Sequence, residues 1–286
     1  MPHTSRPKRP TTQKRTQVTD DDGWTHVANS SNVRRVMRSR PRGPTAITNS
    51  ANEIPSNQLE PTLAPAEAPG RLTLAELQTQ FQTHRERWEA SESWTKLSGI
   101  LDQRLKIRAQ EQASASASAS TTAQCPVDSI VCIGLGSPSG FLRDGWVDRR
   151  AVSLYQLAAL ASIKDQVACK TTYPDIKVYA QDPVFNTLDE SLLAMLNITV
   201  LRHPEAFSHI TPNTMLFCPG AERKHLELLL PSKPWLLFGG PLEHADSGTV
   251  LQEYVDAAGS YCLPGFEQLE HAFWNMRLYW LEAGEE

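Results

Sequence analysis

The sequence predicts an α/β fold, a Rossmann-like three-layer sandwich with a mostly parallel sheet, and two observations support this prediction. After residue 129, short apolar segments such as residues 130–133 alternate with segments of helical periodicity. Each apolar segment ends in turn-forming residues, and the first is followed at once by Gly134-Leu135-Gly136. Alternating strands and helices form a parallel sheet that helices cover on both faces, because the crossover connections are right-handed.

We predict that residues 125–286 form this Rossmann-like domain. Within it, Thr187-Leu188-Asp189-Glu190 has the spacing of a capping box, which predicts the start of a helix. The last aromatic-rich segment, residues 272–281, is consistent with a strand or with a helix. The strands are expected at residues 130–133, 176–179, 198–201, 215–218 and 235–238, and the helices at residues 149–164, 187–196, 221–230 and 249–258.

Residues 71–112 are predicted to form an amphipathic helical segment in front of this domain. Thr73-Leu74-Ala75-Glu76 has capping-box spacing, and large apolar residues then recur near helical intervals. One long helix or two in series would satisfy the pattern. Packing against the domain is favoured over a coiled coil with a partner, because only two or three heptads are present. Residues 113–124 alternate Ala and Ser and are predicted to be a low-complexity linker.

Residues 1–70 are predicted to be a disordered, basic and Pro-rich tail that is dispensable for folding. Residues 1–50 carry a net charge of +7, whereas the rest of the chain carries −11. This asymmetry favours a targeting or interaction segment over a nucleic-acid-binding domain, so direct nucleic-acid binding is not expected and protein partners are. The basic clusters at residues 6–9 and 34–40 indicate either nuclear import, an acidic partner or a solvated tail.

Composition also excludes several classes of protein. The five cysteines form no C-x-x-C pair, so neither a zinc knuckle nor a disulfide framework is indicated and reduced thiols are expected. No apolar run approaches the length of about 20 residues that a membrane helix needs, so no membrane association is expected. The protein is therefore expected in the cytoplasm, the nucleus or both.

The candidate ligand-binding residues are Gly134, Gly136, Ser137 and Asp182. Glycines directly after a strand let a ligand approach the backbone, and Asp182 follows the second strand, where an acid commonly accepts hydrogen bonds from a ribose. The pattern departs from G-x-G-x-x-G, and Asp182 lies 46 residues beyond Gly136 instead of about 20. Two interpretations stay open: a nucleotide-like ligand between the turn and Asp182, or a structural turn with Asp182 capping a loop.

The sequence contains no complete catalytic set, so catalytic residues and cofactors stay unknown. Cys218 could act as a nucleophile if His203 or His244 approached it, although a free cysteine is more often a small buried apolar residue. The segment Glu243-His244-x-Asp246 could hold a metal, but no second cluster supports it and no metal site is expected. Charged residues in the loop after the glycine turn are expected to form exposed ion pairs: Arg143, Asp144, Asp148 and Arg149.

Four motifs resemble one known family when they are read in order. They are IGLGS at residues 133–137, YQLA at 155–158, YAQDPVF at 179–185 and FCPG at 217–220. Together they are similar to the Sensitivity to Red Light Reduced (SRR-like) family over about residues 128–245. The stretch Trp24-Thr25-His26-Val27 in the tail is also similar to amino termini in such proteins.

The resemblance implies a regulatory protein of circadian or stress type, for which no reaction is established. Two features depart from the family pattern: Pro219-Gly220-Ala221 replaces Pro-His-Cys, and Gly239-Gly240 replaces Gly-Asn. Any role of the missing His or Asn is therefore not carried over. We expect a non-enzymatic regulatory protein in intracellular signalling or transcription-linked regulation. The alternative is a nucleotide- or S-adenosylmethionine-binding enzyme, most plausibly a methyltransferase.

Overall fold

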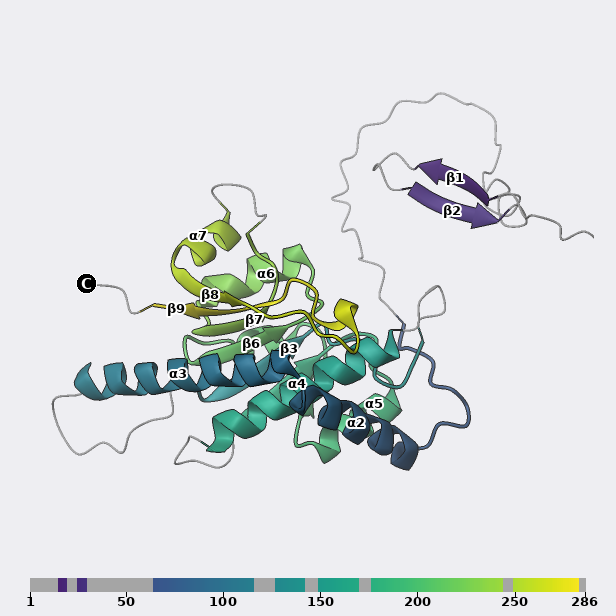
Figure 1. Cartoon of the computed structure of the whole chain (residues 1–286), viewed down its shortest axis with the longest axis horizontal. Helices are drawn as coiled ribbons and strands as arrows, with labels where there is room; N and C mark the ends of the chain where they lie inside the picture. Colours follow the sequence, from purple (N-terminus) through teal and green to yellow (C-terminus); the bar gives the residue numbers. More distant parts are fainter. Residues whose placement is uncertain are drawn as a thin grey trace, which may run out of the picture. The chain divides into compact units, whose positions relative to one another are not determined.

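The computed structural model describes residues 15–19, 25–29, 64–115, 127–141, 149–169, 176–243 and 249–282. The chain divides into two units, Met1–Gln58 and Leu59–Glu286. The first unit contains an antiparallel pair of strands, β1 (Arg15–Thr19) and β2 (Thr25–Asn29) (Figure 1). The sequence did not predict this pair, because isolated two-stranded hairpins are marginal in water and leave a weak signal. The basic clusters, Trp24 and the rest of the expected tail up to residue 63 lie outside the described residues.

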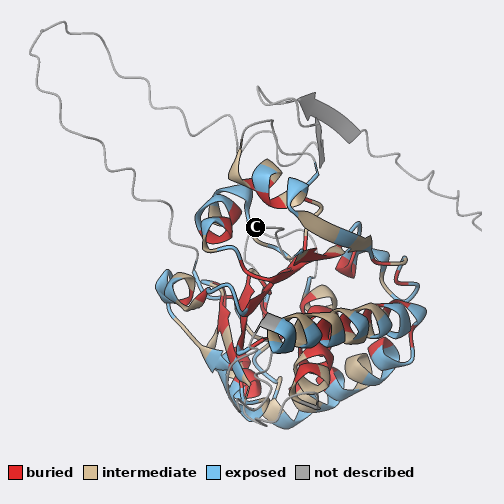
Figure 2. Ribbon diagram, turned by 90° about the vertical axis from the view of Figure 1, so that its left-hand side faces the viewer, coloured by how far each residue is buried: buried red, intermediate tan, exposed pale blue. Residues whose placement is uncertain are grey.

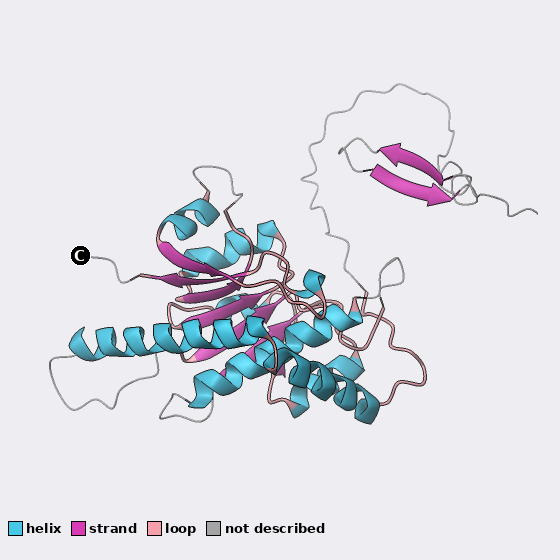
Figure 3. Ribbon diagram, in the orientation of Figure 1, coloured by secondary structure: helices cyan, strands magenta, loops and turns pink. Residues whose placement is uncertain are grey.

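The second unit is built on a seven-stranded sheet with the order β5-β4-β3-β6-β7-β9-β8 (Figure 3). Neighbouring strands from β5 to β7 are parallel, and β9 and β8 add two antiparallel strands at one side. The predicted α/β fold with a mostly parallel sheet is therefore confirmed. The strands are β3 (Ser129–Ile133), β4 (Lys177–Gln181), β5 (Thr199–Val200), β6 (Thr214–Cys218), β7 (Leu236–Gly239), β8 (Ala258–Cys262) and β9 (Arg277–Leu281).

Helices cover both faces of this sheet, which makes three layers. Along β3, Ile130 and Cys132 belong to one hydrophobic core, whereas Val131 and Ile133 belong to the other, because side chains alternate along a strand. All of β3 is buried, as a central parallel strand between two helical layers must be. Figure 2 shows buried strands in the middle of the domain. Side chains of α2 (Leu74–Glu89), α3 (Glu92–Ala115), α4 (Arg150–Cys169) and α5 (Thr187–Met195) fill the first core; those of α6 (Arg223–Leu229) and α7 (Val250–Asp256) fill the second.

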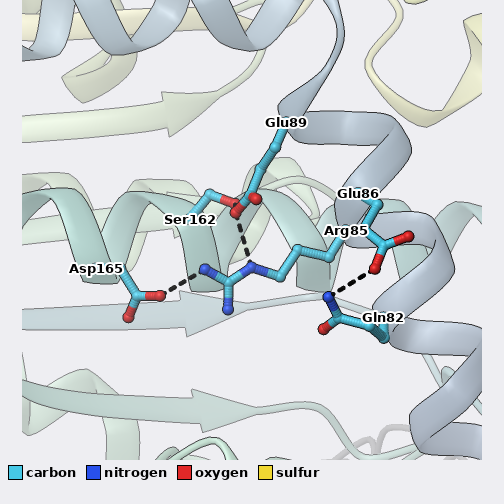
Figure 4. Close-up of polar contacts among 6 residues, drawn as sticks. All are labelled: Gln82, Arg85, Glu86, Glu89, Ser162 and Asp165. Carbon is cyan, nitrogen blue, oxygen red and sulfur yellow. Dashed lines mark hydrogen bonds and ion pairs between the residues drawn. The ribbon is translucent and has the colours of Figure 1, made fainter.

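The helical segment, for which one long helix or two were open, forms two helices, α2 and α3, and it packs on the domain, the arrangement that was favoured over a coiled coil. Thr73 caps α2 in a reciprocal capping box with Glu76. Figure 4 shows how the end of α2 joins α4: the Arg85 guanidinium lies 2.8 Å from Glu89 and 2.6 Å from Asp165. The Ser162 hydroxyl donates to the same Glu89 carboxylate at 2.8 Å.

Three local predictions differ from the structure. The capping box of α5 starts one residue earlier than expected: Asn186 is the N-cap and Asp189 the reciprocal partner. The strand β8 was not predicted, because it has no continuous apolar run; only Ala258 falls in a predicted element, the helix at residues 249–258. Residues 64–70, which were assigned to the tail, contact the domain, and Ala66 is buried. The final segment, left open between strand and helix, ends in the strand β9.

The expected linker lies almost entirely outside the described residues, and its first three residues continue α3. In the described part of the chain, every helix is too short or too polar to cross a lipid bilayer.

Candidate functional site

The carboxyl ends of the parallel strands define the edge of the sheet where open α/β domains bind ligands. The chain leaves β3 toward β4 on one side and returns to β6 on the other, so the topological switch point lies between β3 and β6. Five loops lie at this edge: those that follow β3, β4, β5, β6 and β7. We call this region the carboxyl edge.

At the switch point, the loops after β3 and β6 touch backbone to backbone. Gly134 has a φ of +75°, and a Cβ added to it would lie 2.6 Å from the carbonyl carbon of Gly220. A Cβ added to Gly220 would lie 2.5 Å from the Gly134 oxygen. These distances are too short for real side chains, so both positions require glycine. Gly220, where the sequence departs from the family pattern, thus lies in close backbone contact with Gly134.

The structure brings the predicted glycine turn and Asp182 together, in direct contact. One Asp182 carboxylate oxygen accepts the Gly136 amide at 2.7 Å, and the other accepts the Val184 amide at 3.1 Å. Burial raises the pKa of Asp182 above its ordinary value, and these two amide bonds oppose the rise. A ligand lying between Gly136 and Asp182 would have to replace the bond that joins them. Ligand binding at these residues stays a prediction.

A second carboxylate, Asp189, organises the loop that contains Ser137. Asp189 is fully buried and accepts the Ser137 hydroxyl at 2.6 Å, the Ser139 amide at 2.9 Å and the Asn186 amide at 3.1 Å. The Ser137 oxygen in turn accepts the Gly140 amide at 2.8 Å. Ser137, a predicted ligand-binding residue, is therefore engaged inside the protein. Capping-box spacing placed Asp189 at the start of a helix, but no local signal predicts its contacts with residues about 50 positions away.

Asn186 links this network to the segment before the domain. Its side-chain oxygen caps α5 by accepting the Leu188 and Asp189 amides at 2.9 and 3.1 Å. Its side-chain nitrogen donates to the Ser139 hydroxyl at 2.9 Å and to the Ala66 carbonyl at 3.0 Å. A single amide side chain thus joins three parts of the chain.

Cys218 lies at the floor of a pocket of about 280 Å³ beyond the ends of β6 and β7. Burial raises the pKa of its thiol to about 12, so the thiol is neutral at physiological pH. His244, one proposed partner, lies outside the described residues. The lining residues are Cys218, Pro219, Ala221, Arg223, Leu226, Gly240, Pro241, Leu242 and Leu251.

His203, the other proposed partner of Cys218, is engaged elsewhere on the carboxyl edge. The Gln181 side-chain oxygen accepts the Ala206 amide at 2.9 Å, so its nitrogen is the donor that faces His203 Nδ1 at 3.1 Å. His203 Nδ1 is therefore an acceptor, and its Nε2 carries the proton in the neutral ring. The His203 ring also packs against Phe207 and His225, with centroids 5.4 and 5.7 Å away. No local sequence pattern predicts this cluster.

Glu243, the first member of the candidate metal motif, contacts Tyr279 and Arg277 beside the pocket. Tyr279 donates its hydroxyl to Glu243 at 3.0 Å and accepts the Leu242 amide at 3.0 Å, while Arg277 lies 2.9 Å from the Glu243 carboxylate. His244 and Asp246 lie outside the described residues, as do Arg143, Asp144 and Asp148. Among the residues that are described, no three metal-binding side chains form a cluster.

The fold and its edge define a doubly wound α/β domain with two amino-terminal helices built into its core. The family model for the SRR1 domain matches residues 77–280, from the first turn of α2 to the end of β9. The chain belongs to the SRR1-domain family. The match confirms the resemblance and extends it, since the motifs traced only about residues 128–245. A comparison with curated proteins finds none that matches the chain.

Proposed function

We propose that this SRR1-domain protein is a non-enzymatic regulator of intracellular signalling or transcription, and that its carboxyl edge recognises a small ligand without transforming it. The observation that carries the proposal is the state of the reactive groups at this edge. Asp182 and Asp189 both accept backbone amides, and the Cys218 thiol is neutral. The carboxylate oxygens are engaged inside the protein, and the thiol is not ionised, so these three groups present no free base or nucleophile to a ligand.

The Cys218 thiol is almost entirely un-ionised at physiological pH. Nucleophilic attack requires the thiolate, and a pKa of about 12 leaves roughly one thiol in 10⁵ ionised at pH 7. Catalytic cysteines have the opposite shift, because a neighbouring cation or helix terminus stabilises their thiolate. Cys218 therefore supplies a packed wall for the pocket, and an apolar ligand group would meet it as a small apolar surface.

The pocket at Cys218 is the recognition site that the edge offers. Its volume of about 280 Å³ lies just below the usual range for ligand pockets, which suits a ligand smaller than a dinucleotide. Five of its nine described lining residues are leucine or proline, and Arg223 adds the one charged side chain among them. The basic tail would supply contacts to acidic protein partners and, as a proposal, an address to the nucleus as well as the cytoplasm.

The alternative function is a nucleotide- or S-adenosylmethionine-binding enzyme, most plausibly a methyltransferase. One observation favours it: a left-handed glycine turn follows the first parallel strand and bonds to an acid at the end of the next strand. In doubly wound folds, this arrangement commonly binds the ligand of a nucleotide enzyme.

A thermal-shift screen on the full chain separates the two functions. Nucleotides, S-adenosylmethionine and small apolar acids are the probes, and Asp182→Asn and Leu242→Ala are the variants. Stabilisation that persists in Asp182→Asn and disappears in Leu242→Ala supports the pocket. Stabilisation by S-adenosylmethionine that Asp182→Asn abolishes, together with methyl transfer from it, would overturn the regulatory proposal.

A further inference from the structure

Residues 64–68, which we call the strap, cross two loops of the carboxyl edge. The Ala66 amide donates to the Val184 carbonyl at 2.8 Å, next to the end of β4. Glu67 and Phe141 exchange two backbone hydrogen bonds, each 3.0 Å long, as in an antiparallel bridge. Backbone pairing of this kind does not depend on side-chain identity, so a segment can bind and leave without a specific side-chain lock.

The strap also has one closely fitted side chain. Ala66 is only 5% exposed, and a Cβ added to Gly140 would lie 2.7 Å from the Ala66 Cβ and 3.0 Å from its carbonyl carbon. The φ of Gly140 lies outside the left-handed region, so steric contact with the strap is what requires glycine there. The contact between the strap and the loop after β3 therefore leaves no room for one additional methyl group at Gly140.

The bonds of the strap are shared with the network around Asp189. The Asn186 side-chain nitrogen donates both to Ala66 and to Ser139, and the Ser139 amide donates to Asp189. If the strap leaves, Asn186 loses one acceptor and the Phe141 amide loses its partner. The loop from Ser137 to Phe141 then keeps the bonds that Asp189, Ser137 and Asn186 make within it.

We propose that the strap is a detachable closure, and that its release loosens the loop that follows the glycine turn. The strap is the first described part of the second unit after the basic amino-terminal unit. A partner that draws the chain away before residue 64 would act on the carboxyl edge through these few bonds. The proposal does not depend on which ligand the edge recognises.

The test is residue-resolved amide hydrogen exchange on the full chain. Ala66→Leu places a larger side chain against Gly140 and should expel the strap, whereas Ala64→Leu is a matched control at an exposed position of the same segment. The informative amides are those of Ser139 and Gly140, whose acceptors are Asp189 and Ser137 and not the strap. Their exchange should accelerate at least about tenfold in Ala66→Leu and stay unchanged in Ala64→Leu.

A second pair of variants approaches the contact from the opposite side. Gly140→Ala adds the colliding methyl group, and Gly70→Ala adds a methyl group where nothing lies within 4 Å. If the amides of the strap and of Phe141 exchange faster while those of Ser139 and Gly140 stay protected, release of the strap does not loosen the loop, and that part of the proposal is refuted. If the strap amides stay protected in both Ala66→Leu and Gly140→Ala, the strap is not detachable and the proposal fails.

Discussion

A substitution at Asp182 tests whether this carboxylate stabilises the fold through its bonds to the Gly136 and Val184 amides. Replacing it with Asn keeps the shape but sets an amide NH₂ against a backbone N–H, at Gly136 or at Val184. The expected loss of unfolding free energy is about 1–3 kcal/mol. Chemical denaturation of Asp182→Asn and of the unchanged protein measures it, and an unaltered stability would show that these bonds contribute nothing.

The pH dependence of that loss follows from the raised pKa of Asp182. Burial favours the protonated carboxyl in the folded state, so the group contributes stability below its ordinary pKa of 3.8. That contribution is lost as the pH rises through the higher folded-state pKa. Since Asn does not titrate, the stability difference between the two proteins should be largest at acidic pH and should shrink toward neutrality. A difference that grows with pH would contradict the assignment.

Gly134 tests the contact at the switch point. Gly134→Ala forces a side chain into a left-handed backbone and against Gly220, so we expect a loss of more than about 2 kcal/mol. Gly99→Ala is the control, because Gly99 lies in α3 with nothing within 4 Å. That change should stabilise the protein by about 0.5–1 kcal/mol. Similar changes in unfolding free energy at the two positions, measured by denaturant unfolding, would argue against the close contact between Gly134 and Gly220.

At the scale of elements, the two amino-terminal helices are integral to the core. Trp88 at the end of α2 is fully buried among Trp94, Phe266 and Phe273. Trp88→Ala should cost about 3–5 kcal/mol, as large aromatic deletions do. Trp274→Ala, at a position that is 63% exposed, should stay within about 0.5 kcal/mol. If the two substitutions lowered the unfolding free energy equally, Trp88 and the end of α2 would contribute little to the packing of the core.

Local signals predicted most of these elements, and their failures have physical reasons. Apolar strands such as β3 and β6 are buried on both faces, and their continuous hydrophobicity is readable without knowing any contact. The edge strand β8 has mixed exposure and no such run. At the carboxyl edge, turn chemistry predicted the positions of Gly134, Gly136 and Asp182, while ligand binding by them stays a prediction. The roles of Asn186, Asp189 and Gln181 were not predicted, because they depend on partners that the fold brings from distant segments.

At the scale of the whole molecule, the boundary of the folded unit lies earlier than composition suggested. Deleting residues 1–58 removes only the first unit and should leave the melting temperature within about 2 °C. Deleting residues 1–70 also removes the strap and the burial of Ala66, which should lower the melting temperature by about 4–9 °C. Differential scanning fluorimetry compares the two truncations. If they melt together, the strap adds no stability.

The most direct test of the central claim, that the carboxyl edge recognises without reacting, is the alkylation rate of Cys218 as a function of pH. Peptide mapping by mass spectrometry separates Cys218 from the exposed Cys262, which reports reagent activity in the same sample. With a thiol pKa of about 12, Cys218 should react slowly at pH 7 and keep accelerating to the highest pH at which the protein stays folded. A rate that is already high at pH 7 and reaches a plateau below pH 8 would reveal a stabilised thiolate and contradict the account.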